Sequence, residues 1–169
     1  MENIVSSTTG FIHLVVSVIA LITGLWVLCS QKGTKRHKQI GYLYALSMAL
    51  LNLTAFMIYK LYGKFGIFHW LAVVSSITLI IGIYPVLRKK GKNYLLTHFS
   101  FMYWSVIGLY CAFVAEIFSR LPNLIRTQTG EAMTVFYKLV GLGSGLVMFT
   151  GIIIYIRLKP KWTKQYRKA

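Results

Sequence analysis

The sequence has very few acidic residues. Three glutamates stand against nineteen lysines and arginines in a chain of 169 residues, which gives a formal net charge of +16. Only 13% of the residues are charged, whereas soluble proteins carry about 25%. The basic residues form short clusters between long apolar runs, while a nucleic-acid-binding protein would be polar and would carry its charge on exposed helices or loops. We therefore expect no nucleic-acid partner.

Cysteine and catalytic motifs are also scarce. Cys29 and Cys111 both lie inside apolar runs, which indicates neither a disulfide framework nor a CxxC metal site. The chain has no P-loop, GxSxG or HExxH motif, which argues against a hydrolase or an ATP-driven pump. Whether it is an enzyme stays open. Residues 1–10 contain no basic segment, so we expect the first apolar run to remain as a membrane span rather than to be cleaved as a signal peptide.

Long apolar runs dominate what is present, and 56% of the residues are hydrophobic. Runs of about 20–26 residues can cross about 30 Å of hydrocarbon as helices, and their apolar residues do not alternate as in a barrel. We predict an all-α, polytopic membrane helix bundle that forms one domain over residues 1–157, with a basic tail at 158–169. The five expected transmembrane helices cover about 11–30, 40–61, 67–87, 94–119 and 136–156.

The distribution of basic residues predicts the orientation. One set of fourteen lies in the loops after the first and third spans and in the tail: Lys32, Lys35, Arg36, Lys38, Arg88, Lys89, Lys90, Lys92, Arg157, Lys159, Lys161, Lys164, Arg167 and Lys168. The other side has five: Lys60, Lys64, Arg120, Arg126 and Lys138. The positive-inside rule then predicts an outside N-terminus and a cytoplasmic C-terminus. We expect a multi-pass protein of the cytoplasmic membrane, in contact with its lipid bilayer.

The four histidines fall at two depths in this layout. His13 and His69 lie near the outer ends of their spans, His37 at the inner mouth of the second span, and His98 about one turn inside the fourth. A weak repeat relates the two halves and would bring His13 near His69 and His37 near His98. Opposed imidazoles in a helix bundle can hold a haem, and two stacked pairs would carry electrons across the membrane. In this plan only, the chain resembles small di-haem cytochromes b.

Glu116 offers a second interpretation, because its depth is similar to that of His13 and His69. Two histidines and a carboxylate can bind Zn²⁺ or another divalent metal. Glu116 can instead pair with Arg120, four residues further along the helix. Haem b, a divalent metal and ordinary contacts of interfacial histidines with lipid headgroups therefore stay open as alternatives.

Helical spacing places polar residues on shared faces. Asn52 shares a face with His37, Tyr44 and Met48, and Ser105 shares one with His98, Met102 and Glu116. We expect this polar stripe to point into the bundle, since polar groups are costly against lipid. Gly141 and Gly145 of the last span predict a packing surface for another helix, in this chain, in a second copy or in a membrane partner.

Three segments carry a family resemblance: KGTKRHKQIGYLYALSMALLNLTAF, FHWLAVVSSITLIIGIYP and THFSFMYWSVIGLYCAFVAE. Their landmarks are a KGT-x2-H-x3-G-x2-Y entry to the second span, an N-x-T in its outer half, and an H-x3-M-x2-S step that leads to A-E in the fourth. Over residues 10–121 the chain resembles a family of small bacterial predicted membrane proteins with a domain of unknown function. The resemblance implies a multi-span bacterial membrane protein and supplies no activity.

From the residues we expect an integral membrane protein with a histidine-ligated haem or metal site that serves transmembrane electron transfer. Two other functions stay open. The polar stripe could line the path of a small transporter or a proton- or ion-coupled carrier. The glycine face of the last span could dock an accessory subunit on a larger membrane complex.

Overall fold

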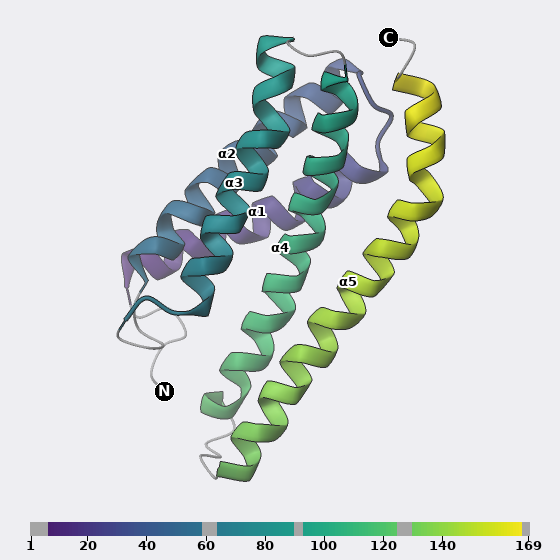
Figure 1. Cartoon of the computed structure of the whole chain (residues 1–169). Helices are drawn as coiled ribbons and strands as arrows, with labels where there is room; N and C mark the ends of the chain where they lie inside the picture. Colours follow the sequence, from purple (N-terminus) through teal and green to yellow (C-terminus); the bar gives the residue numbers. More distant parts are fainter. Residues whose placement is uncertain (1–6, 59–63, 90–92, 125–129, 167–169) are drawn as a thin grey trace. The chain divides into compact units, whose positions relative to one another are not determined.

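The part of the chain that the structure describes folds into five α-helices and contains no β-strand. The computed structural model describes residues 7–58, 64–89, 93–124 and 130–166. In chain order the helices are α1 (Thr8–Cys29), α2 (Lys35–Met57), α3 (Ile67–Arg88), α4 (Tyr94–Leu124) and α5 (Gly130–Tyr166) (Figure 1). The predicted all-α class is confirmed.

Each of these helices is long and apolar enough to cross a membrane. The 22 residues of α1 rise about 33 Å, slightly more than the roughly 30 Å of a bilayer's hydrocarbon. Large apolar side chains cover the outer surfaces of the helices, and Leu142 is 71% exposed. Lipid tails satisfy such surfaces, so the prediction of a five-span membrane protein in contact with a bilayer is confirmed. The direction of insertion and the identity of the membrane stay predictions.

The second helix begins five residues before the predicted span. The Thr34 side chain caps α2 by accepting a hydrogen bond of 3.1 Å from the backbone N–H of His37. An N-cap threonine satisfies a donor that has no partner within the helix, and this lets α2 start at Lys35 within the charged segment. His37 therefore lies in the first turn of α2 rather than before it. Residues 59–61, the end of the predicted span, lie outside the described residues.

The last helix is longer than the apolar run that predicted it. Helix α5 has 37 residues and continues past Pro160 to Tyr166, so much of the expected tail at 158–169 is helical. Lysine and arginine are good helix formers, so a helix can run beyond the hydrocarbon that ends its apolar segment. The Lys159 ammonium lies 5.5 Å from the centre of the Tyr155 ring, and Trp162 packs edge-on against the same ring. Residues 167–169 lie outside the described part.

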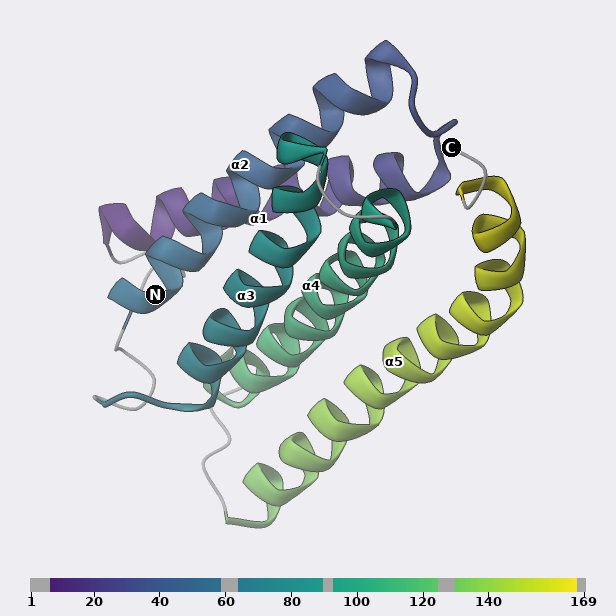
Figure 2. The same ribbon diagram turned by 45° about the horizontal axis from the view of Figure 1, so that its top comes forward.

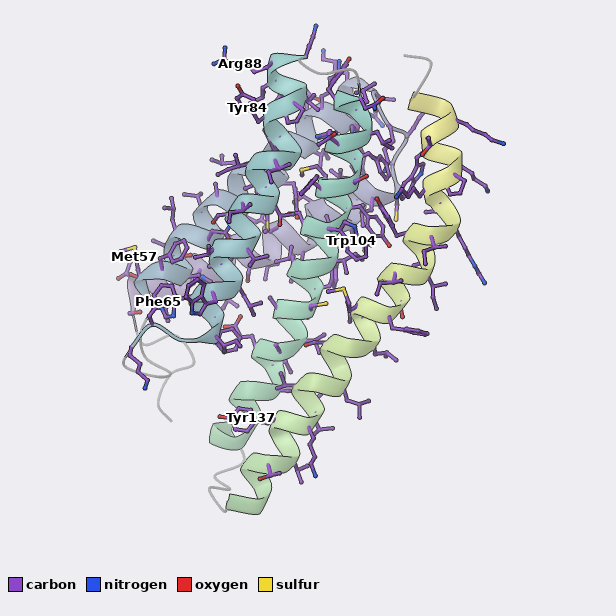
Figure 3. All side chains as sticks on the ribbon, viewed as in Figure 1. Met57, Phe65, Tyr84, Arg88, Trp104 and Tyr137 are labelled. Carbon is purple, nitrogen blue, oxygen red and sulfur yellow. The ribbon has the colours of Figure 1, made fainter. Side chains whose placement is uncertain are left out.

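The chain divides into two compact units, residues 1–106 and residues 107–169, with the boundary inside α4. In the first unit α2 packs against α1 and α3, as both ribbon views show (Figures 1 and 2). Met57 and Phe65 mark one end of this unit, and Tyr84 and Arg88 lie towards the other (Figure 3). Whether residues 1–157 fold as a single domain stays a prediction.

Tyr44 lies at the centre of the first unit and has no exposed surface. Its ring packs on Gly24 of α1, where an added Cβ would lie 2.9 Å from Tyr44 and 3.3 Å from Val106. The hydroxyl groups of Tyr44 and Ser105 are 2.8 Å apart, so the ring also connects α2 to α4. Met48 and Val106 are the other large side chains that are fully buried. Gly24 therefore serves helix packing, and the tyrosine ring fills the flat space beside it.

In the second unit the later part of α4 packs on α5 at Gly143 and Gly151. The sequence points to Gly141 and Gly145 as a packing surface. A Cβ at Gly143 would lie 2.7 Å from Val114 and 2.9 Å from Phe118, and one at Gly151 would lie 2.9 Å from Ile107. By contrast, Cβ atoms at Gly141 and Gly145 would meet nothing within 4 Å among the described residues. Self-association or partner binding through Gly141 and Gly145 stays a prediction.

Candidate functional site

All four histidines belong to the first unit, each on a different helix. His13 lies on α1, His37 on the first turn of α2, His69 on the first turn of α3, and His98 on α4. Their value as ligands depends on which ring nitrogen carries the proton, because a neutral imidazole binds metal through its unprotonated nitrogen. The hydrogen bond made by the other nitrogen decides this.

His98 makes the most decisive of these bonds. Its Nδ1 lies 2.7 Å from the backbone carbonyl oxygen of Gly82 on α3. A carbonyl can only accept, so Nδ1 must carry the proton and donate it. The lone pair of neutral His98 is then on Nε2, which is the arrangement common in metal-ligating histidines.

His37 makes a weaker bond of the same kind. Its Nδ1 lies 3.3 Å from the Ser30 hydroxyl oxygen, and that hydroxyl donates its proton to the carbonyl oxygen of Val27 at 3.3 Å. Because a hydroxyl has a single proton, Ser30 Oγ accepts from His37 Nδ1 whenever it donates to Val27. In this state Nε2 of His37 also holds the lone pair.

An electrostatic interaction links the rings of His37 and His98. Lys32, in the connection between α1 and α2, acts on His37 in the same way. We name the group formed by Ser30, Lys32, His37, Gly82 and His98 the His37–His98 cluster. The approach of His37 and His98 at the inner side stays a prediction, and this electrostatic interaction supports it.

Lys32 also closes the end of α1. Its Nζ donates to the carbonyl oxygens of Val27 and Leu28, each at 2.6 Å, and lies 5.7 Å from the centre of the Phe99 ring. Partial burial lowers the pKa of Lys32 below its usual value of 10.5, while the nearby Cys29 opposes this shift. A cation at this position compensates the negative end of the helix dipole.

His13 is held by Thr54 of α2, with Nδ1 and the hydroxyl oxygen 2.9 Å apart. The Thr54 hydroxyl has carbonyl acceptors in its own helix at Leu50 and Leu51, both at 2.9 Å. With its proton donated to one of them, Thr54 accepts from His13 Nδ1. His13 thus has the same tautomer as His98.

His69 has the opposite arrangement. Its Nδ1 accepts a hydrogen bond of 3.1 Å from the backbone N–H of Gly66 and so caps the start of α3. The proton of the neutral ring is then on Nε2, and the ring packs 4.9 Å from Phe65. Metal binding through Nε2 would require His69 to give up its cap, so the predicted pair with His13 has less support than the His37–His98 cluster.

The zinc hypothesis combined His13, His69 and Glu116. Among the described residues, no group of three or more His, Cys, Asp or Glu side chains could hold a metal ion. Glu116 belongs to the second unit and the two histidines to the first, so this hypothesis stays a prediction. The side chain of Arg120, the alternative partner of Glu116, lies outside the described residues.

Both members of the polar stripe are buried in the first unit. Ser105 is 4% exposed and is bonded to Tyr44, while Asn52 is 6% exposed. Nδ2 of Asn52 has no hydrogen-bond partner within the described part of the chain. An unsatisfied buried amide is costly, and Asn52 therefore remains a candidate contact for a polar ligand or water.

Sequence reasoning missed Ser30 and Gly82, which hold the two clustered histidines. Ser30 lies seven residues before His37, across a turn whose geometry follows from the Thr34 cap and from Gly33 with its positive φ of 80°. Gly82 contributes only its backbone, which no residue pattern marks as a histidine partner. Pro85, three residues after Gly82, was the sequence signal for an irregular backbone here, since a proline removes a hydrogen bond from the preceding helical turn.

Comparison with known protein families identifies a relationship. The family model described as predicted membrane protein, DUF2306, matches residues 10–159. Neither a curated protein nor a solved structure matches the chain. The match covers the five helices almost completely and agrees with the resemblance that the second, third and fourth spans carry. The chain therefore belongs to the DUF2306 family of predicted membrane proteins.

Proposed function

We propose that this membrane protein binds a redox-active haem between His37 and His98 and uses it for electron transfer within the membrane. One observation supports the proposal above all others. Two imidazoles from different helices interact electrostatically. The Gly82 carbonyl leaves the Nε2 lone pair of His98 for a ligand, and the Ser30 hydroxyl allows the same for His37.

The number of donors favours haem over a bare metal ion. A structural zinc site takes four protein ligands and a catalytic one takes three, and the described residues offer no group of three. A porphyrin supplies four nitrogens of its own, so two axial histidines complete the coordination of its iron. A pair of histidines in a helix bundle therefore matches the needs of haem best.

The surroundings restrict where such a group would lie. The Tyr44 ring fills the space beside Gly24, so a macrocycle would not lie there. Lys32 adds positive charge next to His37, which favours an anionic substituent such as a carboxylate at the edge of a ligand. The position near a helix end would also give a soluble electron donor a short path to the centre.

A reduced-minus-oxidised visible spectrum of protein purified from membranes tests the proposal. We expect a Soret and an α band, both lost in His37→Ala and in His98→Ala. The matched controls His13→Ala and His69→Ala keep the bands, because those histidines lie outside the cluster. Bands that are absent from the wild type, or that vanish only in the two control variants, contradict the proposal.

Asn52 supports a second candidate, a small carrier for a polar solute or a proton. Its amide is buried on the face of α2 that also carries Tyr44, and Nδ2 lacks a partner among the described residues. A carrier would use such a donor to hold its solute in the apolar interior. Uptake into proteoliposomes that depends on Asn52 and not on His98 would favour this second function over the first.

A further inference from the structure

We propose that Gly82 and Pro85 of α3 are positioning residues that fix the tautomer of His98 and so prepare its Nε2 for a ligand. The part that concerns ligand binding rests on the proposed function. The part that concerns the tautomer does not, because it follows from the hydrogen bond between the Gly82 carbonyl and His98 in this chain alone.

Gly82 lets α3 and α4 approach closely. An added Cβ at Gly82 would lie 2.8 Å from Met102 Sδ and 3.3 Å from the Cβ of Phe101. A larger residue would have to displace the Met102 side chain or shift α4, and a shift of α4 would lengthen the bond of 2.7 Å between the Gly82 oxygen and His98. The absence of a side chain is therefore what brings this carbonyl within reach of the imidazole.

Pro85 loosens the helix at the same point. A proline has no N–H, so Ile81 O lacks its usual donor four residues later, and the ring crowds that carbonyl. A helix bends at such a site and its adjacent carbonyls tilt outward. Gly82 is the next residue after Ile81, and its carbonyl is the one that accepts from His98. The glycine thus supplies closeness, and the proline removes a backbone hydrogen bond of α3 next to the oxygen that accepts from His98.

The two clustered histidines differ as a result. Gly82 O can only accept, so it fixes the proton of His98 on Nδ1 and makes Nε2 a better donor to a metal. Ser30 Oγ can accept or donate, so the hydroxyl can rotate to serve either tautomer of His37. We infer that His98 has its ligand-binding tautomer before a ligand arrives, and that His37 can change its tautomer when the ligand binds.

Nitrogen NMR of ¹⁵N-histidine-labelled protein in nanodiscs, without added haem, tests the tautomer directly. We expect His98, assigned by the signal missing from His98→Gln, to carry its proton on Nδ1. In Pro85→Ala and in Gly82→Ala a mixture of both tautomers is expected. The controls Pro160→Ala and Gly41→Ala leave the signal unchanged, because Pro160 lies in α5 and a Cβ at Gly41 would meet nothing within 4 Å.

A double variant guards against general disruption. Gly82→Ala clashes first with the flexible end of Met102, so Gly82→Ala combined with Met102→Ala should recover much of the Nδ1-protonated signal. A wild-type proton on Nε2 of His98, or an unchanged tautomer in both single variants, overturns the proposal.

Haem titration provides the second readout, and loss of the carbonyl partner should weaken haem binding about 10–100-fold. A wild type that shows the Nδ1 tautomer and binds no haem would refute the proposed function and leave this inference standing.

Discussion

The hydroxyl groups of Tyr44 and Ser105 meet at 2.8 Å in the interior of the first unit and join α2 to α4. Tyr44 is 0% and Ser105 4% exposed, so water does not compete for this bond. The bond lies between the His37–His98 cluster at one end of the unit and the contact of His13 with Thr54. It therefore holds the helix that carries His37 against the helix that carries His98.

Removing either hydroxyl should weaken the first unit. Tyr44→Phe and Ser105→Ala are each expected to lower the free energy of unfolding by about 0.6–1.7 kcal/mol, the range measured for hydrogen bonds between membrane helices. The double variant should cost less than the sum of the single variants, because both lose the same bond. Unfolding by denaturing detergent measures the three values, and strict additivity would show that the two hydroxyls do not act as a pair.

Gly24→Ala should destabilise the protein by about 1–3 kcal/mol, the usual cost of overfilling a packed core. The new Cβ would lie 2.9 Å from the Tyr44 ring, which Val106 confines on another side. Gly41→Ala is the matched control on α2, where a Cβ meets nothing within 4 Å and helix propensity favours alanine by about 0.8–1.0 kcal/mol. Thermal unfolding of both variants measures the difference, and equal melting temperatures would mean that α1 does not pack on Tyr44 in the way described.

The second unit offers a parallel comparison between neighbouring glycines of α5. Gly143→Ala should weaken the packing of α5 on α4, since its Cβ would lie 2.7 Å from Val114, whereas Gly145→Ala should not. Two hydrogen bonds join Cys111 and Ser144 at the same contact. Ser144 Oγ donates to the carbonyl oxygen of Cys111 at 3.1 Å, and Cys111 Sγ donates to the carbonyl oxygen of Ser144 at 3.5 Å. Protease sensitivity of the α4–α5 connection reports the loosening. Greater damage from Gly145→Ala would instead indicate that another helix covers Gly145.

The orientation is open to a direct test. Fourteen of the nineteen basic residues fall on the side predicted to be cytoplasmic, so a fluorescent protein fused after Ala169 should fold and fluoresce in bacterial cells. An alkaline phosphatase fused at the same point should be inactive, because that enzyme needs the periplasm. The reverse pair of results would place the His37–His98 cluster at the outer side.

Much of the fold follows from the sequence because the bilayer is a simple solvent. The apolar runs predict the five helices, and the spacing of Tyr44, Met48 and Asn52 correctly marks the buried face of α2. The start of α2 was missed because the apolar run begins after the Thr34 cap, although a capping threonine was visible. The length of α5 was missed because hydropathy reports the thickness of the hydrocarbon and not the end of the helix.

The chemistry of the histidines was only partly predictable. Helix order predicts that His37 lies near His98. The tautomers depend on Ser30 Oγ, Thr54 Oγ1, Gly66 N–H and Gly82 O, and two of these four partners are backbone atoms. A backbone group has no signature in the sequence, and its position follows from how two helices pack. This is why His13 and His69 looked equivalent in the sequence and differ in the structure.

Electron paramagnetic resonance of the oxidised protein, purified from membranes without added haem, tests the central claim most directly. Two axial imidazoles should give a low-spin ferric signal in the wild type, with His13→Ala unchanged. The same measurement on His98→Ala should show no haem signal, because the variant loses its haem. A low-spin signal that survives in both His37→Ala and His98→Ala, or the absence of haem from the wild type, would contradict ligation by this pair.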